Sequence, residues 1–160
     1  MFIGRKEELN FLEDRYNSAD GQLVVLYGRR RVGKTELLRQ FCEHKEHVFY
    51  TCTEIIDEKQ LEAFSQRVLE KNKQAAKYIT RFSDWEQALL SITELAKDKK
   101  IVVVIDEFPY MVKGNNAIPS ILQKLWDEVL KQSNVMLILC GSAMSFIEKE
   151  VLAEKNPLYG

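Results

Sequence analysis

Segment 28–35, which reads GRRRVGKT, carries residue types at a spacing that could hold a polyphosphate. It fits the pattern G-x-x-x-x-G-K-[ST], in which two glycines let the backbone curl and point successive N–H groups at an anion. Lys34 can then reach the β- and γ-phosphates, and the Thr35 hydroxyl can ligate Mg²⁺. The nucleotide contacts predicted from this segment and the residue that follows it are Gly28, Arg29, Arg30, Arg31, Val32, Gly33, Lys34, Thr35 and Glu36.

The three consecutive arginines at 29–31 are not required by this pattern. Solvated charges are the commoner case for arginine on a surface loop. The alternatives are a contact with the nucleotide, with a partner subunit or with nucleic acid. The sequence leaves these alternatives open.

Two adjacent carboxylates, Asp106 and Glu107, directly follow the apolar run Ile101–Ile105. At the carboxyl end of a parallel strand such side chains face the crevice where ligands bind. Asp106 could hold Mg²⁺ through its water shell, and Glu107 could polarise the water that attacks the γ-phosphate. The alternative is an ordinary turn after a strand. Because a phosphate-binding segment precedes the pair, we interpret it as a Walker B element, with Lys34 and Glu107 as catalytic residues.

Four short apolar runs could supply the strands that position these residues. Three of them are continuous, as is typical of strands covered on both faces of a parallel sheet. The run His47–Thr53 is more mixed and is expected nearer an edge. The four predicted strands are Gln22–Tyr27, His47–Thr53, Ile101–Ile105 and Val135–Cys140.

Helical patterns separate the apolar runs. Capping boxes predict three helix starts, and Pro119 suits the first turn of another helix. The predicted boxes pair Asp57 with Gln60, Ser83 with Glu86 and Ser145 with Glu148. The predicted helices are Arg5–Tyr16, a helix from Lys34, helices that begin near Asp57, Ser83 and Pro119, and Ser145–Leu152.

Alternating strands and helices predict an α/β fold with three layers around a parallel sheet. The 160 residues, 46% hydrophobic and 29% charged, fit a single domain over 1–160. The net charge of −1 gives no bulk electrostatic reason to bind nucleic acid or a membrane surface. Three isolated cysteines, the lack of a signal-peptide pattern and the short apolar runs predict a cytoplasmic protein without a membrane span.

Five segments, taken together and in order, resemble the archaeal-type P-loop ATPases, relatives of the AAA+ and STAND ATPases of archaea and bacteria. The segments are FIGRKEEL (2–9), LYGRRRVGKTELL (26–38), IVVVIDEF (101–108), LILCGS (137–142) and NPLYG (156–160). The resemblance implies ATP and Mg²⁺ as ligands. It also implies a P-loop NTPase sheet of the additional-strand class, in the order 1-4-3-2, with a fifth strand beyond the C-terminus.

The resemblance also assigns roles to three further residues. Gly4 and Arg5 would lie near the adenine, or they belong to a loop at a helix start with a solvated arginine. Ser142 would present a polar group to the γ-phosphate, cap the following helix, or do both. Family members continue past a PLYG-like stretch, so we expect this chain to be the core of a longer protein.

Two functional hypotheses follow. The first is a Mg²⁺-dependent ATPase whose turnover changes the conformation of an attached or partner module. The second is a nucleotide-dependent binding or signalling switch with little turnover, which could engage nucleic acid. A winged-helix or nuclease-like C-terminal region, a DNA or protein partner and an oligomer are all compatible with the resemblance.

Overall fold

Four parallel strands form the centre of the structure, a computed structural model that describes residues 6–27 and 33–141. Their order across the sheet is β1-β4-β3-β2, which confirms the predicted order 1-4-3-2. The strands are β1 (Gln22–Tyr27), β2 (His47–Thr51), β3 (Ile101–Asp106) and β4 (Val135–Gly141).

Burial differs between the inner and outer strands of this sheet. Every residue of β3 and β4 is buried, as expected from their continuous apolar sequences. In β2 burial alternates along the strand, and β2 pairs with β3 alone among the described residues. The prediction that this strand lies near an edge is therefore confirmed for the described part of the sheet.

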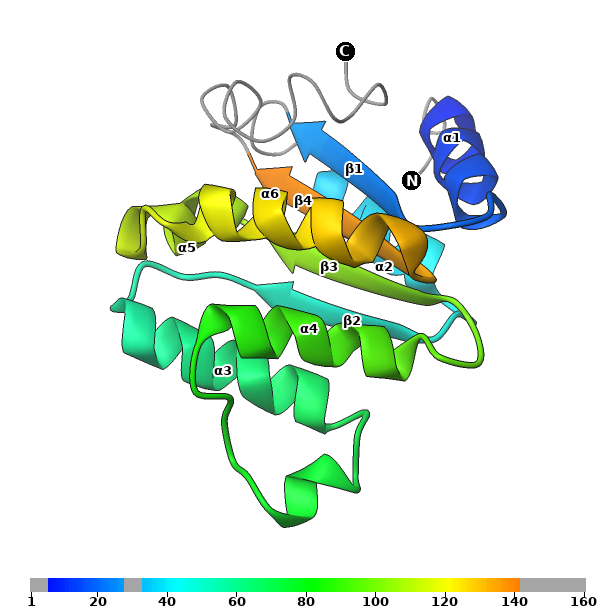
Figure 1. Ribbon diagram of the computed structural model, residues 1–160. Coiled ribbons are helices and arrows are strands. Elements are labelled where there is room, and N and C mark those ends of the chain that lie inside the picture. Colours follow the sequence, from blue (N-terminus) through cyan, green and yellow to red (C-terminus); the bar gives the residue numbers. More distant parts are fainter. Residues whose placement is uncertain (1–5, 28–32, 142–160) are drawn as a thin grey trace.

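Helices cover both faces of the sheet and complete the three predicted layers (Figure 1). One face carries α3, α4, α5 and α6, and the other carries α1 and α2. The helices are α1 (Lys6–Tyr16), α2 (Lys34–Cys42), α3 (Asp57–Leu69), α4 (Trp85–Leu95), α5 (Phe108–Gly114) and α6 (Ile118–Glu128), with short 3₁₀ turns η1 (Ala75–Lys77) and η2 (Leu130–Gln132).

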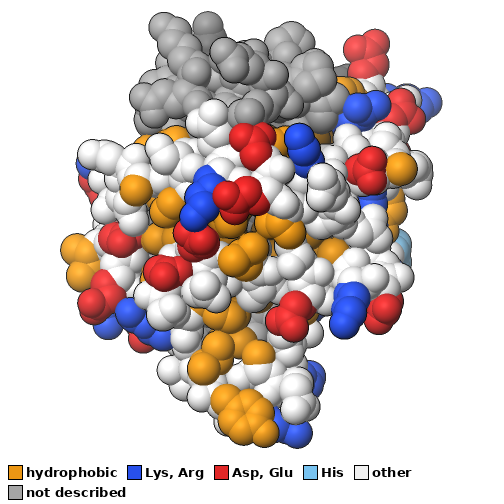
Figure 2. Space-filling model, in the orientation of Figure 1, with side chains coloured by type: hydrophobic (Ala, Val, Ile, Leu, Met, Phe, Trp, Pro, Cys, Tyr) orange, Lys and Arg blue, Asp and Glu red, His pale blue; other side chains and the backbone are white. Residues whose placement is uncertain are grey.

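The sheet separates two hydrophobic cores because successive strand residues point to opposite faces. Val103 of β3 packs into the core beneath α3 to α6, with Phe64 and Trp85. Its neighbours Val102 and Val104 pack into the core beneath α1 and α2. Outside the cores, the face of α3, α4 and α6 carries charges of both signs among hydrophobic side chains (Figure 2). In the parts of the chain described here, no helix combines the length and apolar character needed to cross a bilayer.

The capping box predicted for Asp57 and Gln60 is wrong, although α3 does begin at Asp57. The buried Gln60 amide instead forms hydrogen bonds with both backbone groups of Thr53. Its Nε2 donates to the carbonyl at 2.8 Å, and its Oε1 accepts from the N–H at 3.3 Å. Strand β2 ends at Thr51 and not at Thr53 as predicted, because its neighbour β3 ends at Asp106, the partner of Thr51. The Asp57 carboxylate accepts a hydrogen bond from Trp85 Nε1 at 2.7 Å and so ties α3 to α4.

The start of α4 also differs from the prediction. Asp84 caps the helix, and its carboxylate accepts the Gln87 N–H at 2.8 Å, so Ser83 and Glu86 do not form the predicted box. Aspartate and serine are both good caps, and the chain uses the one that stands directly before the helix. Pro119 lies in the first turn of α6 as predicted. The predicted helix 145–152 lies outside the described residues.

Candidate nucleotide-binding site

The phosphate-binding segment is described from its second glycine onward. Gly33 has φ 79° and ψ 21°, a left-handed conformation that glycine adopts without steric cost, and it precedes the first residue of α2. The Gly33 carbonyl accepts the Leu37 N–H at 2.9 Å, so the helix begins directly behind it. The predicted site residues Gly4, Arg5, Gly28, Arg29, Arg30, Arg31, Val32 and Ser142 lie outside the described residues.

Helix α2 brings the next two predicted residues to the carboxyl ends of the inner strands. The Thr35 hydroxyl donates a hydrogen bond to Asp106 Oδ2 at 2.8 Å. Lys34 Nζ donates to the carbonyl of Gly141, the last residue of β4, at 3.3 Å. The buried side chains of α2, among them Leu38 and Phe41, fix the helix against the sheet. The hydrogen bond from Thr35 thus joins the start of α2 to Asp106, while Lys34 reaches the end of the neighbouring strand β4.

Asp106 is a buried carboxylate with both oxygens engaged. It is 4% exposed, and its Oδ1 accepts the N–H of Glu107 at 2.9 Å while Oδ2 accepts from Thr35. A buried charge needs such partners, since an unpaired carboxylate in this position would be costly. These two hydrogen bonds also fix the direction in which the carboxylate points.

Two buried thiols, those of Cys52 and Cys140, have pKa values that depend on Asp106. Burial raises the pKa of Cys140 well above its ordinary value, and the adjacent Asp106 carboxylate raises it further. The pKa of Cys52 is raised for the same two reasons, in the same order. Both thiols thus stay neutral beside an interior carboxylate. A charge on the buried Asp106 interacts more strongly with ligand charges than it would in water.

Glu107 has the backbone conformation least expected of its residue type. It stands directly before α5 with φ 55° and ψ 41°, in the left-handed region that costs a non-glycine residue about 1–2 kcal/mol. Its side chain makes no capping hydrogen bond to α5 and is half-buried. Strained residues cluster at functional sites, where the surrounding structure maintains them. The strained, half-buried Glu107 thus stands directly beside the buried Asp106.

The donor set at this position fits Mg²⁺. The Thr35 hydroxyl and the Asp106 carboxylate are hard oxygen donors, held within 2.8 Å of each other at the start of a helix. Mg²⁺ is usually bound by one or two such protein groups, while phosphates and water supply the other ligands. Thr35 and Asp106 are thus the residues that would hold the ion.

Glu36, the remaining described residue of the predicted set, is exposed in the first turn of α2. Among residues 6–27 and 33–141, no hydrogen bond or ion pair links it to Thr35 or Asp106. An acidic side chain there interacts favourably with the helix dipole. The structure therefore brings Lys34, Thr35, Asp106 and Glu107 together but does not bring Glu36 into the same network.

Two features of the site were not predicted from the sequence. The Gly141 carbonyl accepts the Lys34 side chain, a contact between residues 107 positions apart that no local pattern could indicate. Helix α5 begins immediately after the acidic pair, and Pro109 in its first turn was a usable signal for it.

Comparison with known proteins gives a family and one relative that spans the whole chain. A family of ATPase domains, found predominantly in Archaea, matches residues 2–160. An uncharacterized protein of Methanocaldococcus jannaschii is 36% identical over 160 residues, which are 100% of this chain and 34% of that protein. The chain thus spans about a third of the length of this relative.

Solved structures share the arrangement of strands and helices. The Walker-type ATPase PABY2304 of Pyrococcus abyssi superposes with a TM-score of 0.68 at 24% identity, covering 100% of this chain and 51% of that protein. Cdc6p from Pyrobaculum aerophilum superposes with a TM-score of 0.65 at 18% identity, covering 98% of this chain and 42% of that protein. At these identities the likeness shows a common P-loop NTPase fold.

Proposed function

The chain belongs to the family of ATPase domains found predominantly in Archaea, and we propose that it binds Mg²⁺–ATP at the carboxyl ends of β3 and β4 and hydrolyses it. The observation that carries this proposal is the 2.8 Å hydrogen bond between Thr35 and the buried Asp106. That bond joins the start of the phosphate-binding helix to the acidic strand end. Hydrolysis would change the conformation of an attached or partner module.

Each described residue has a separate role in the proposed reaction. Lys34 and the N-terminal amides of α2 stabilise the charge that develops on the γ-phosphoryl oxygens. Thr35 and Asp106 hold Mg²⁺, which when bound neutralises charge on the β- and γ-phosphates. Glu107 orients the attacking water and accepts its proton, a role supported by its half-buried side chain next to the metal-binding carboxylate.

The residues outside the described ranges complete the proposed site. Gly28 to Val32 would surround the phosphates, Gly4 and Arg5 would lie by the adenine, and Ser142 would face the γ-phosphate. Ser142 follows Gly141, whose carbonyl already receives Lys34, and this position supports its assignment. The free, buried cysteines Cys42, Cys52 and Cys140 support a reducing, cytoplasmic location.

Steady-state phosphate release tests the proposed hydrolysis. We expect Glu107→Gln to lower kcat about 10²- to 10⁴-fold, the usual contribution of a general base, while ATP still binds. The matched control is Glu128→Gln, which changes an exposed carboxylate at the end of α6 and should leave turnover unchanged. Equal turnover in Glu107→Gln and the wild-type protein would show that Glu107 is not the general base.

The same assay separates the ATPase from the second hypothesis. Phosphate release is measured with and without duplex DNA, together with retention of labelled ATP. Near-zero phosphate release under both conditions, with tight ATP retention, would favour the nucleotide-dependent switch over the ATPase. Release stimulated by DNA would identify nucleic acid as a partner of the ATPase.

A further inference from the structure

The outer edge of β2 carries backbone groups that pair with no other strand in the described part of the chain. In the ladder to β3, the Val102 N–H donates to the Glu46 carbonyl at 3.0 Å and the Cys52 N–H donates to the Asp106 carbonyl at 2.8 Å. In a parallel pair every second residue turns its N–H and C=O to the neighbour. Even-numbered residues of this segment therefore face β3, and the odd-numbered ones face away from it. The outward-facing residues of β2 are His47, Phe49 and Thr51.

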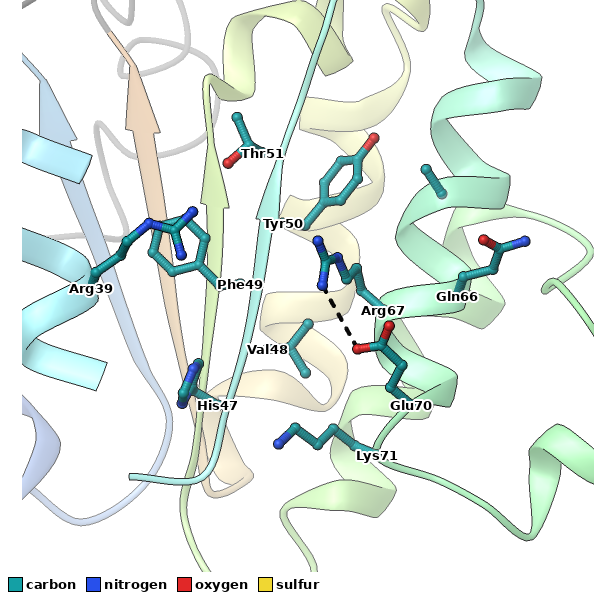
Figure 3. Close-up of a pocket in the computed structure, with 11 residues that line it drawn as sticks. Arg39, His47, Val48, Phe49, Tyr50, Thr51, Gln66, Arg67, Glu70 and Lys71 are labelled. Carbon is teal, nitrogen blue, oxygen red and sulfur yellow. Dashed lines mark ion pairs between the residues drawn. The ribbon is translucent and has the colours of Figure 1, made fainter. Parts of the chain in front are cut away.

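A groove of about 630 Å³ runs along this edge, with Arg39 of α2 on one side and Ala63 and Arg67 of α3 on the other. Figure 3 shows Arg39 beside Phe49 on one side of β2, and Arg67 and Glu70 on the side of Tyr50. At about 3.3 Å per residue, the five residues of β2 extend for about 17 Å. The groove thus follows a strand edge long enough to pair with a short extended segment.

The groove is predominantly cationic. Among the described residues, its charged lining consists of Arg39, Arg67 and Lys71 against one carboxylate, that of Glu70. The Arg67–Glu70 ion pair, at 3.8 Å, joins side chains that are 56% and 63% exposed, so it neutralises the groove only weakly. The Arg39 guanidinium carbon lies 4.3 Å from the centre of the Phe49 ring, and this contact holds the cation beside the free edge.

We propose that this groove binds an extended acidic peptide segment of a partner protein as an added strand on β2. The peptide backbone pairs with the outward N–H and C=O groups of Phe49 and its neighbours. Its carboxylates face Arg39, Arg67 and Lys71, where arginine can form two parallel hydrogen bonds to one carboxylate.

Charge and backbone chemistry favour this occupant over two others. A second copy of the chain, paired edge to edge, would bring the same arginines and lysine close to their own copies. Duplex DNA offers negative charge but no peptide groups to pair with the strand. Only an acidic peptide meets both the cations and the free backbone groups.

Fluorescence anisotropy tests binding with a labelled peptide of about ten residues in which pairs of glutamates alternate with pairs of threonines, so that carboxylates reach both faces of the sheet. Two control peptides replace glutamate by lysine, or replace every threonine by proline and keep the charge. We expect binding of the first peptide alone, because lysine reverses the charge and proline cannot pair its backbone. Equal binding of the proline peptide would overturn strand addition. Tighter binding of duplex DNA that displaces the peptide would overturn the choice of partner.

Variants of the purified protein locate the binding site. Arg67→Glu combined with Lys71→Glu should weaken peptide binding about tenfold or more. Lys59→Glu changes a residue that lies on α3 with Arg67 but outside the groove lining, so it should leave peptide binding unchanged. Thr51→Pro removes an outward N–H without breaking a hydrogen bond to β3 and should also weaken peptide binding. Absence of peptide binding by the wild-type protein would mean that these cations serve to block the edge against pairing, and would overturn the proposal.

Amide hydrogen exchange gives a readout that a purely electrostatic contact would not produce. With peptide bound, hydrogen exchange at the amides of Phe49 and Thr51 should become slower. Exchange at the amides of Val48 and Tyr50, which face β3, should be slow with and without peptide. A uniform change along β2, or none, would contradict strand addition. None of these measurements depends on ATP hydrolysis.

Discussion

The two candidate binding regions differ in how their functional groups are held. At the carboxyl ends of the inner strands, Asp106 is buried and both of its oxygens accept hydrogen bonds within the protein. At the outer edge of β2, the cations Arg67 and Lys71 are exposed on long side chains. The first region has its geometry fixed before a ligand arrives, whereas the second must order side chains when a partner binds. The inner region thus suits chemistry on a small ligand, and the outer one suits recognition of a chain.

The largest effect is expected from removing the cation of the inner region. Lys34→Ala should weaken ATP binding about 100-fold, because a charge-assisted contact to the β- and γ-phosphates contributes roughly 2–3 kcal/mol. Calorimetric titration with ATP and Mg²⁺ measures this change.

The matched control for that variant is Lys99→Ala, in the turn before β3 at the opposite end of the strand. Within residues 6–27 and 33–141, Lys99 forms an exposed 3.7 Å ion pair with Glu46, far from the start of α2, so its removal should not alter ATP affinity. If Lys34→Ala binds ATP as tightly as Lys99→Ala does, the nucleotide does not lie at the start of α2.

A smaller effect separates the two regions by their response to salt. Raising ionic strength from about 0.1 M to about 1 M shortens the screening length from about 10 Å to about 3 Å. The exposed cations of the groove should then lose most of their attraction, so the acidic peptide should bind about tenfold more weakly. ATP affinity, measured in the same buffers, should fall less because Asp106 is buried and Lys34 is half-buried, whereas the groove cations Arg67 and Lys71 are exposed. An equal loss for both ligands would contradict the proposed difference in burial.

The smallest effect concerns the strain at Glu107. Glu107→Gly should raise the free energy of unfolding by about 1 kcal/mol or leave it unchanged, since glycine adopts a φ of 55° without steric cost. The same variant should lose turnover. Urea unfolding monitored by circular dichroism measures the first quantity, with Glu107→Ala, which keeps the strain, as the control. A clear loss of stability in Glu107→Gly relative to Glu107→Ala would show that the backbone is not strained there.

Short-range patterns predicted the inner site better than the outer one. Gly33, Lys34 and Thr35 stand in one local motif, and Asp106 follows a strand whose apolar run is unmistakable. The strand order came from the family resemblance, because residue spacing alone does not fix which strands are neighbours. The contact between Lys34 and Gly141 depends on that order, so no local pattern indicates it.

One predicted capping box was wrong because a tertiary contact recruited its polar side chain. Gln60 has the spacing of a capping residue, but it is buried and binds the backbone of Thr53. The groove along β2 was not predicted either, since its cations come from α2 and α3 and meet only when both helices pack beside the strand. The sequence thus predicted the meeting of Thr35 with Asp106, which two motifs mark, and missed contacts between elements that no motif marks.

The most direct test of the central claim is the Mg²⁺ dependence of ATP binding in the wild-type protein and in Thr35→Val. Valine keeps the shape of threonine but removes the hydroxyl that donates to Asp106. Calorimetric titrations with Mg²⁺ and with a chelator should show that the ion tightens ATP binding at least about tenfold in the wild-type protein, a gain of about 1.4 kcal/mol. Thr35→Val should lose most of that gain. If Mg²⁺ tightened binding equally in both proteins, Thr35 and Asp106 would not hold the metal.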